Sequence, residues 1–224
     1  MGVDWDDEAL AVSSDSTLVA KYRRLQSWYR EVQLGVRQAG IGANDKHIGS
    51  MLPTEVVEAH PSLNFFNLNA YAHAETRIEE VRGEKGTLPE DRLRRNLLSS
   101  TPLCFNVFGA IGQHPAFLVM VQSLFDPDAT EIVEVVCEWA PQPPADYLDD
   151  RSAFDALVVY LTGDGRRRFV GIETKYTELF SPTVYDSQRY RDVTANCGWF
   201  TQDCVAELSA SSTNQLWQVH PGGS

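Results

Sequence analysis

The sequence predicts an α/β (α+β) domain, in which helices come first, strands follow and a further helix comes last. Apolar residues recur at helical spacing in three stretches, at 17–39, about 67–81 and 89–108. Strand-like apolar runs then cover 131–138 and 154–161, and a third starts at Phe169. We expect one main domain, residues 86–224, preceded by a helical N-terminal extension over residues 1–85.

The first helix has clear signals at both ends, because Ser16 can cap its start and Gly40 can follow its end. The next stretch, 40–53, is rich in glycine and polar residues and is typical of a loop or linker. The apolar run 117–121 fits a first strand or the end of a helix equally well. The run 131–138 is the more convincing first strand.

Composition describes an ordinary soluble protein. The 224 residues are 43% hydrophobic and 22% charged. No apolar run approaches the ~20 residues that span a bilayer, and the first residues lack the basic and apolar parts of a signal peptide. We therefore expect a cytoplasmic protein without a membrane partner. The four cysteines lack paired metal-finger spacing, so we expect them to be reduced.

A candidate site comes from two residues of the third strand-like run. Glu173 and Lys175 are two positions apart, so on a strand both side chains leave the same face. The preceding strand begins with Asp155, and the glycine-rich residues 163–165 predict a hairpin between the two. A three-residue loop would place Asp155 opposite Glu173, whereas a two-residue loop would turn Asp155 to the other face. We favour the longer loop, because Gly165 suits its left-handed position.

Two carboxylates beside a lysine suit phosphodiester hydrolysis. Oxygen ligands favour Mg²⁺, or Mn²⁺ in its place, and the ion keeps positions for water and substrate phosphate. Such an ion would polarise a phosphoryl oxygen and help to form a hydroxide nucleophile. The lysine would orient that water or offset developing negative charge. A surface ion pair is the simpler alternative for these residues, but their apolar setting favours the catalytic interpretation.

Asp155 followed by Glu173-Thr174-Lys175 resembles the PD-(D/E)XK nuclease superfamily. The wider text, 96–109 followed by 171–178, is similar to a bacterial restriction-endonuclease-like branch of that superfamily. The resemblance covers roughly residues 60–218. It implies a restriction-endonuclease-like core, with a central mixed β-sheet flanked by helices, and metal-dependent cleavage of DNA. A role in bacterial defence is what the restriction-like branch suggests.

The chain departs from the family pattern in two places. Phe154 replaces the proline that usually stands next to the first acid, at little cost because the acid binds the metal. The segment 214–220 looks like the start of a further helix, yet the chain stops soon afterwards. We expect either a naturally short member or a shortened form that lacks its last elements. A missing strand would leave a sheet edge for a covering loop or a homodimer partner.

Several further residues are candidates for this site. Glu138 ends a strand and is a candidate third metal ligand, although a solvated strand face explains it and Glu134 equally well. Glu178 is either a supporting residue or simply exposed. Candidates for contact with nucleic acid are Arg166, Arg167 and Arg168 beside the hairpin, and Arg189 in a helix expected after Pro182.

The net charge of −12 argues against a protein that coats nucleic acid, but it does not exclude a nuclease. We therefore expect a Mg²⁺-dependent deoxyribonuclease. One alternative is a catalytically inactive nuclease-fold protein that binds nucleic acid or a protein partner. Another is a small-molecule phosphoesterase that uses the same metal chemistry.

Overall fold

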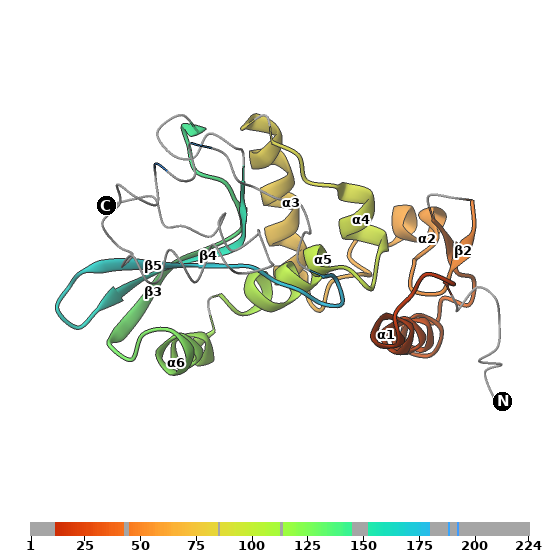
Figure 1. Cartoon of the computed structure of the whole chain (residues 1–224), viewed down its shortest axis with the longest axis horizontal. Coiled ribbons are helices and arrows are strands. Elements are labelled where there is room, and N and C mark those ends of the chain that lie inside the picture. Colours follow the sequence, from red (N-terminus) through yellow and green to blue (C-terminus); the bar gives the residue numbers. More distant parts are fainter. Residues whose placement is uncertain are drawn as a thin grey trace. The chain divides into compact units, whose positions relative to one another are not determined.

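The computed structural model describes residues 12–42, 45–84, 86–112, 114–144 and 152–179, together with Gln188 and Asp192. The chain divides into two units, and each is considered by itself. The first comprises 1–137 and 155–178, and the second comprises 138–154 and 179–224. The order of the helices and strands can be followed in Figure 1.

The first helix is shorter than the sequence pattern predicts. Helix α1 (Thr17–Trp28) begins where expected, because the Ser16 hydroxyl accepts a hydrogen bond from the Val19 backbone N–H at 3.3 Å. It continues as the π-helical turn η2 (Tyr29–Gln33). Gly35 then adopts a left-handed backbone conformation, with φ +70°, which ends helical structure. The predicted end at Gly40 is wrong.

The predicted loop 40–53 contains a small hairpin. Strands β1 (Gly40–Ile41) and β2 (His47–Ile48) pair in antiparallel fashion. Gly40 is required there, because a Cβ atom would lie 2.3 Å from the Leu52 carbonyl oxygen. The buried Arg30 guanidinium donates hydrogen bonds to backbone carbonyls on both sides of the hairpin, including Gly49 at 2.9 Å and Arg37 at 2.7 Å. Helix α2 (Thr54–Ala59) follows.

The second helical prediction is confirmed and the third is only partly correct. Helix α3 (Leu68–Gly83) is capped by Asn67, whose side chain accepts a hydrogen bond from Ala70 N–H at 2.9 Å. The stretch 89–108 is instead interrupted, because Asn96 pairs with Met51 as an antiparallel bridge. It therefore forms three pieces: α4 (Glu90–Arg95), α5 (Ser100–Cys104) and the π-helical η3 (Phe105–Gly109). The run 117–121 lies in helix α6 (Pro115–Leu124) rather than in a strand.

Three strands form the larger sheet, in the order β3 (Ala129–Trp139), β4 (Phe154–Thr162) and β5 (Arg167–Ile172). Strands β4 and β5 are antiparallel, with Ala156 opposite Ile172 and Leu161 opposite Arg167. This is the register of the three-residue loop, and Gly165 has the left-handed φ of +78°. The predicted hairpin is confirmed, and so is the α+β fold class.

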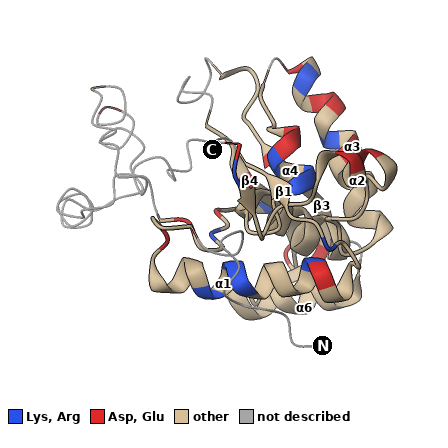
Figure 2. Cartoon of the chain, turned by 90° about the vertical axis from the view of Figure 1, so that its right-hand side faces the viewer, with Lys and Arg blue, Asp and Glu red and all other residues tan. Residues whose placement is uncertain are grey.

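The main hydrophobic core of the first unit joins helices α3, α5, η3 and α6 to strands β3 and β4. Its largest fully buried side chains include Phe105, Phe117, Val121 and Val158. Residues from both sides of position 85 belong to this unit, so the division at that position stays a prediction. Acidic and basic side chains alternate along α3 and α4 (Figure 2). In the described part of the chain, no helix combines the length and apolarity needed to cross a membrane.

Candidate nuclease site

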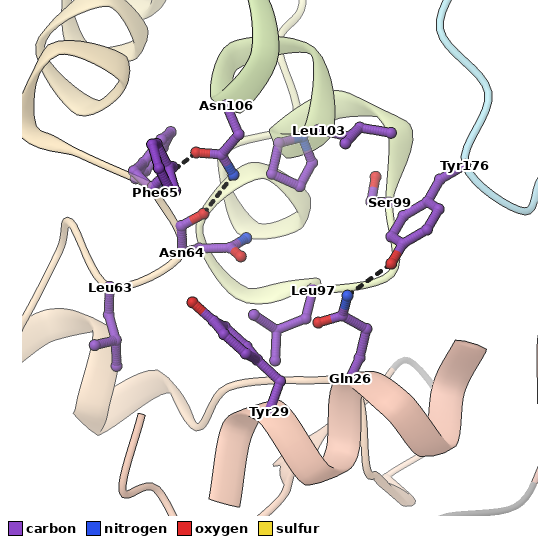
Figure 3. Close-up of a pocket in the computed structure, with 12 residues that line it drawn as sticks. Gln26, Tyr29, Leu63, Asn64, Phe65, Leu97, Ser99, Leu103, Asn106 and Tyr176 are labelled. Carbon is purple, nitrogen blue, oxygen red and sulfur yellow. Dashed lines mark hydrogen bonds between the residues drawn. The ribbon is translucent and has the colours of Figure 1, made fainter. Parts of the chain in front are cut away.

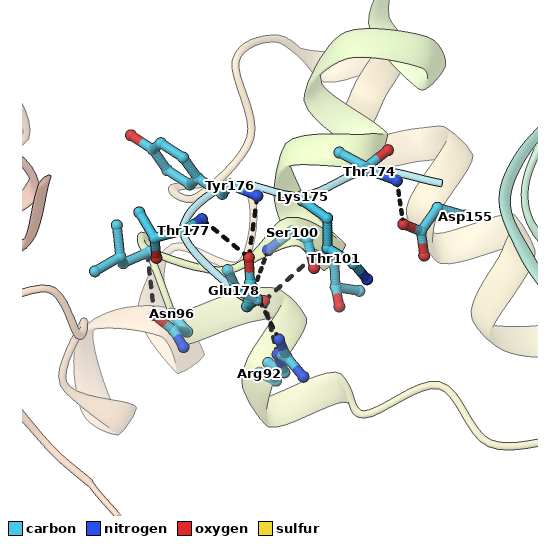
Figure 4. Close-up of polar contacts among 12 residues, drawn as sticks. Arg92, Asn96, Ser100, Thr101, Asp155, Thr174, Lys175, Tyr176, Thr177 and Glu178 are labelled. Atoms are coloured by element: carbon cyan, nitrogen blue, oxygen red, sulfur yellow. Dashed lines mark hydrogen bonds and ion pairs between the residues drawn. The ribbon is translucent and has the colours of Figure 1, made fainter. Parts of the chain in front are cut away.

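Asp155 lies near the start of β4, and its carboxylate faces the segment that follows β5. Its Oδ2 accepts a hydrogen bond from the Thr174 backbone N–H at 2.5 Å (Figure 4). Burial raises the pKa of Asp155 to about 6; the Thr174 N–H acts in the opposite direction, and the nearby charge of Glu173 raises it further. Asp155 is therefore a partly desolvated carboxyl group that another carboxylate approaches, which is a common state of a catalytic acid.

Glu173 and Lys175 do not belong to a strand, because β5 ends at Ile172. They lie in the extended segment directly after it, and the Lys175 ammonium is hydrogen-bonded to Glu173 Oε1. Both side chains are mostly buried, with 22% of Glu173 and 26% of Lys175 exposed. The charges of both act on Asp155. The structure thus brings together the three residues that the sequence singles out, although through a segment beyond the strand.

The segment that carries Lys175 is anchored by Glu178. Its Oε1 accepts hydrogen bonds from the Ser100 backbone N–H at 2.8 Å and from Arg92 at 2.9 Å. Its Oε2 accepts from the backbone N–H groups of Tyr176 at 3.0 Å and Thr177 at 3.2 Å (Figure 4). One carboxylate therefore closes the 173–178 segment on itself and ties it to the start of α5.

The ionisation of Glu178 reflects this anchoring. Burial acts to raise its pKa, but the backbone N–H donors, Ser100 first among them, outweigh burial and lower the pKa to about 2. Glu178 is thus charged wherever the protein is folded near neutral pH. The sequence offered no signal for this role, because the donors come from α5, 78 residues earlier. Only its position three residues after Lys175 could have drawn attention to it.

Helix α5 also supports Asp155 from behind. The Cys104 thiol donates a hydrogen bond to the Asp155 backbone carbonyl oxygen at 2.8 Å. Ser99 caps the helix, because its hydroxyl accepts from Thr101 N–H at 3.3 Å and from Arg92 at 2.7 Å. Asn106 bonds the backbone of Asn64 at 2.9 Å. The upstream segment thus has the structural role expected for Ser99 and Asn106.

The remaining predicted site residues are not gathered by described contacts. Glu138 has a left-handed backbone, with φ +54°, and belongs to the second unit, so its role as a metal ligand stays a prediction. Arg166, Arg167 and Arg168 each pair with an acid, respectively Asp164 at 3.0 Å, Glu134 at 3.6 Å and Asp126 at 2.7 Å. Arg189 and the chain end beyond Asp192 lie outside the described residues.

The donor set at this site fits a hard divalent cation. Asp155 and Glu173 supply oxygen atoms, and a cation would relieve the burial and repulsion that raise the Asp155 pKa. The part of the chain that the structure describes contains no cluster of three or more His, Cys, Asp or Glu side chains able to hold a metal. Two carboxylates leave most positions to water and substrate, as is usual for Mg²⁺.

Comparison with known proteins gives one match. A family model described as the PD-(D/E)XK nuclease superfamily matches residues 13–221. No curated protein and no solved structure matches the chain.

Proposed function

The chain belongs to the PD-(D/E)XK nuclease superfamily, and on that premise we propose that it is a metal-dependent deoxyribonuclease. The observation that carries the proposal is the meeting of Asp155, Glu173 and Lys175 at the end of the β4–β5 hairpin. The substrate is DNA, the ion is Mg²⁺ or Mn²⁺, and the site of action is the cytoplasm, where Cys104 and Cys137 would remain free thiols. Defence against foreign DNA is the biological role we propose.

Asp155 and Glu173 would hold the ion. When bound, it would polarise a phosphoryl oxygen and lower the pKa of a water nucleophile. The Lys175 ammonium would move from Glu173 toward the scissile phosphate and offset the negative charge that develops there. Glu178 would keep that ammonium in place, because it fixes the backbone of the following residue, Tyr176.

Plasmid cleavage tests this proposal. Supercoiled DNA is incubated with the protein in Mg²⁺, Mn²⁺ or EDTA, and nicked and linear products are measured. We expect cleavage in either metal and none in EDTA. Asp155→Asn and Glu173→Gln should abolish cleavage, whereas Glu134→Gln should not, because Glu134 is a half-exposed carboxylate paired with Arg167 on β3.

The outcomes separate the alternatives. A small phosphate ester cut as efficiently as DNA would indicate a phosphoesterase. Binding of DNA with no cleavage in either metal would indicate an inactive nuclease-fold protein. Cleavage that persists in EDTA, or that survives Asp155→Asn, would contradict the proposed site.

A further inference from the structure

A cavity of about 270 Å³ lies within the first unit, beside the segment that carries Lys175. Figure 3 shows it between α1, the 63–66 segment, the start of η3 and Tyr176. Tyr176 and Lys175 are neighbours in the chain, and Tyr176 turns toward α1 while Lys175 pairs with Glu173. The cavity is therefore one residue away from the proposed catalytic ammonium.

Aromatic rings form much of the cavity wall. They are contributed by Tyr29, Phe65, Phe66 and Tyr176. Two of them are open to solvent although they are large: Phe66 is 79% exposed and Tyr29 is 39% exposed. Exposed aromatic faces beside a cavity are suited to stacking on another flat ring.

Two amide side chains at the cavity are held in fixed orientations. Gln26 donates from Nε2 to the Tyr176 hydroxyl at 2.7 Å. The buried Asn64 donates from Nδ2 to the Leu93 carbonyl oxygen at 2.9 Å. Within the described part of the chain, no hydrogen bond reaches Gln26 Oε1 or Asn64 Oδ1. Both oxygens are thus available acceptors, and the bonds of the amide nitrogens decide which atom faces inward.

We propose that this cavity binds one unstacked nucleobase of the DNA substrate, an inference that rests on the proposed nuclease function. The volume lies just below the range of sites for drug-sized ligands, which suits a single base. Aromatic walls would stack on the base, and the two acceptor oxygens would receive hydrogen bonds from an amino group on its edge. Because the net charge of −12 limits affinity through phosphates, base stacking would supply affinity that the acidic chain otherwise lacks.

An unstacked base has two sources, which are single-stranded DNA and a base extruded from a duplex. Short oligonucleotides with a central 2-aminopurine distinguish them, because the emission of this base reports its stacking. Binding is measured in EDTA, so that no strand is cut, with a single strand, a paired duplex, a mismatched duplex and a strand with an abasic centre. We expect a change in emission on binding and the weakest binding by the abasic strand.

Variants test the aromatic wall. Tyr29→Ala and Phe66→Ala should each weaken binding of the single strand about tenfold and remove the change in emission. Phe125→Ala is the matched control, since Phe125 is 42% exposed and does not line the cavity. Circular dichroism checks that each variant folds.

The result separates the cavity from the catalytic function. Variants that bind as the wild type does, or an abasic strand that binds equally well, would overturn the inference, even if the protein cuts DNA. Dependence of binding on Tyr29 without any metal-supported cleavage would instead support the cavity and contradict the nuclease proposal. A change in emission with the mismatched but not the paired duplex would assign the bound base to a weakened helix.

Discussion

Asp155 is a carboxyl group with an unusual pKa at a position where a metal ligand must be ionised. In the metal-free protein, burial raises its pKa from 3.8 to about 6. Because the folded state then binds the proton more tightly than the unfolded state, this group lowers stability as the pH rises from about 4 through 6. A metal ion must compete with that same proton.

The pH dependence of metal binding follows from this competition. We expect Mn²⁺ affinity to be nearly constant above pH 7 and to fall below pH 6, by up to about tenfold per pH unit for one displaced proton. Calorimetric titration at pH 5, 6 and 7.5 measures it. Asp155→Asn should bind weakly and lose the dependence, and equal wild-type affinity at pH 5 and 7.5 would show that Asp155 is not a ligand.

Lys175 is expected to act on the reaction rather than on the metal. Lys175→Ala leaves both carboxylates in place, so Mn²⁺ should still bind while cleavage falls by on the order of 10²-fold or more. Calorimetry beside the plasmid assay separates the two effects. Arg92→Ala, which removes an exposed cation that contacts Glu178 rather than Glu173, serves as the comparison. Full activity of Lys175→Ala would remove the lysine from the mechanism.

The β4–β5 hairpin is the element that sets the geometry of the site, and its loop depends on one glycine. Gly165→Ala would force a side chain into the left-handed region, which costs roughly 1–2 kcal/mol. Gly163→Ala is the matched control, because its new Cβ atom would meet only the Thr130 methyl group at an ordinary 3.8 Å. We expect urea unfolding to show a loss of stability for Gly165→Ala alone. Equal losses would mean that backbone conformation does not decide the loop.

The hairpin was predictable because strand alternation and glycine spacing are local. Its register follows from them, and so does the placing of Asp155 opposite Glu173. The broken helix at Asn96 was not predictable, because the interruption comes from pairing with Met51, 45 positions earlier in the chain. For the same reason the sequence missed the anchoring by Glu178 and the cavity at Tyr176, which depend on contacts between distant residues.

At the scale of the whole molecule, the excess of acidic residues limits contact with DNA phosphates. Arg167 is 64% exposed and pairs only loosely with Glu134, so it is available for such a contact. Arg167→Ala should reduce the slope of log affinity against log salt concentration by about one. Arg82, 56% exposed and paired with Glu79, is the matched control and should leave the slope unchanged. An unchanged slope for both variants would place the DNA elsewhere.

The anchoring of residues 173–178 also sets when the site can form. Glu178 meets Ser100 across 78 residues, and Tyr176 meets Gln26 across 150, so both contacts require the closure of long loops. A ribosome must release nearly the whole chain before Lys175 can take its place, and the nascent protein should be harmless to the cell's own DNA until then. In refolding from urea, we expect cleavage activity to recover later than the helical circular dichroism signal. Simultaneous recovery would show that the site assembles with the rest of the fold.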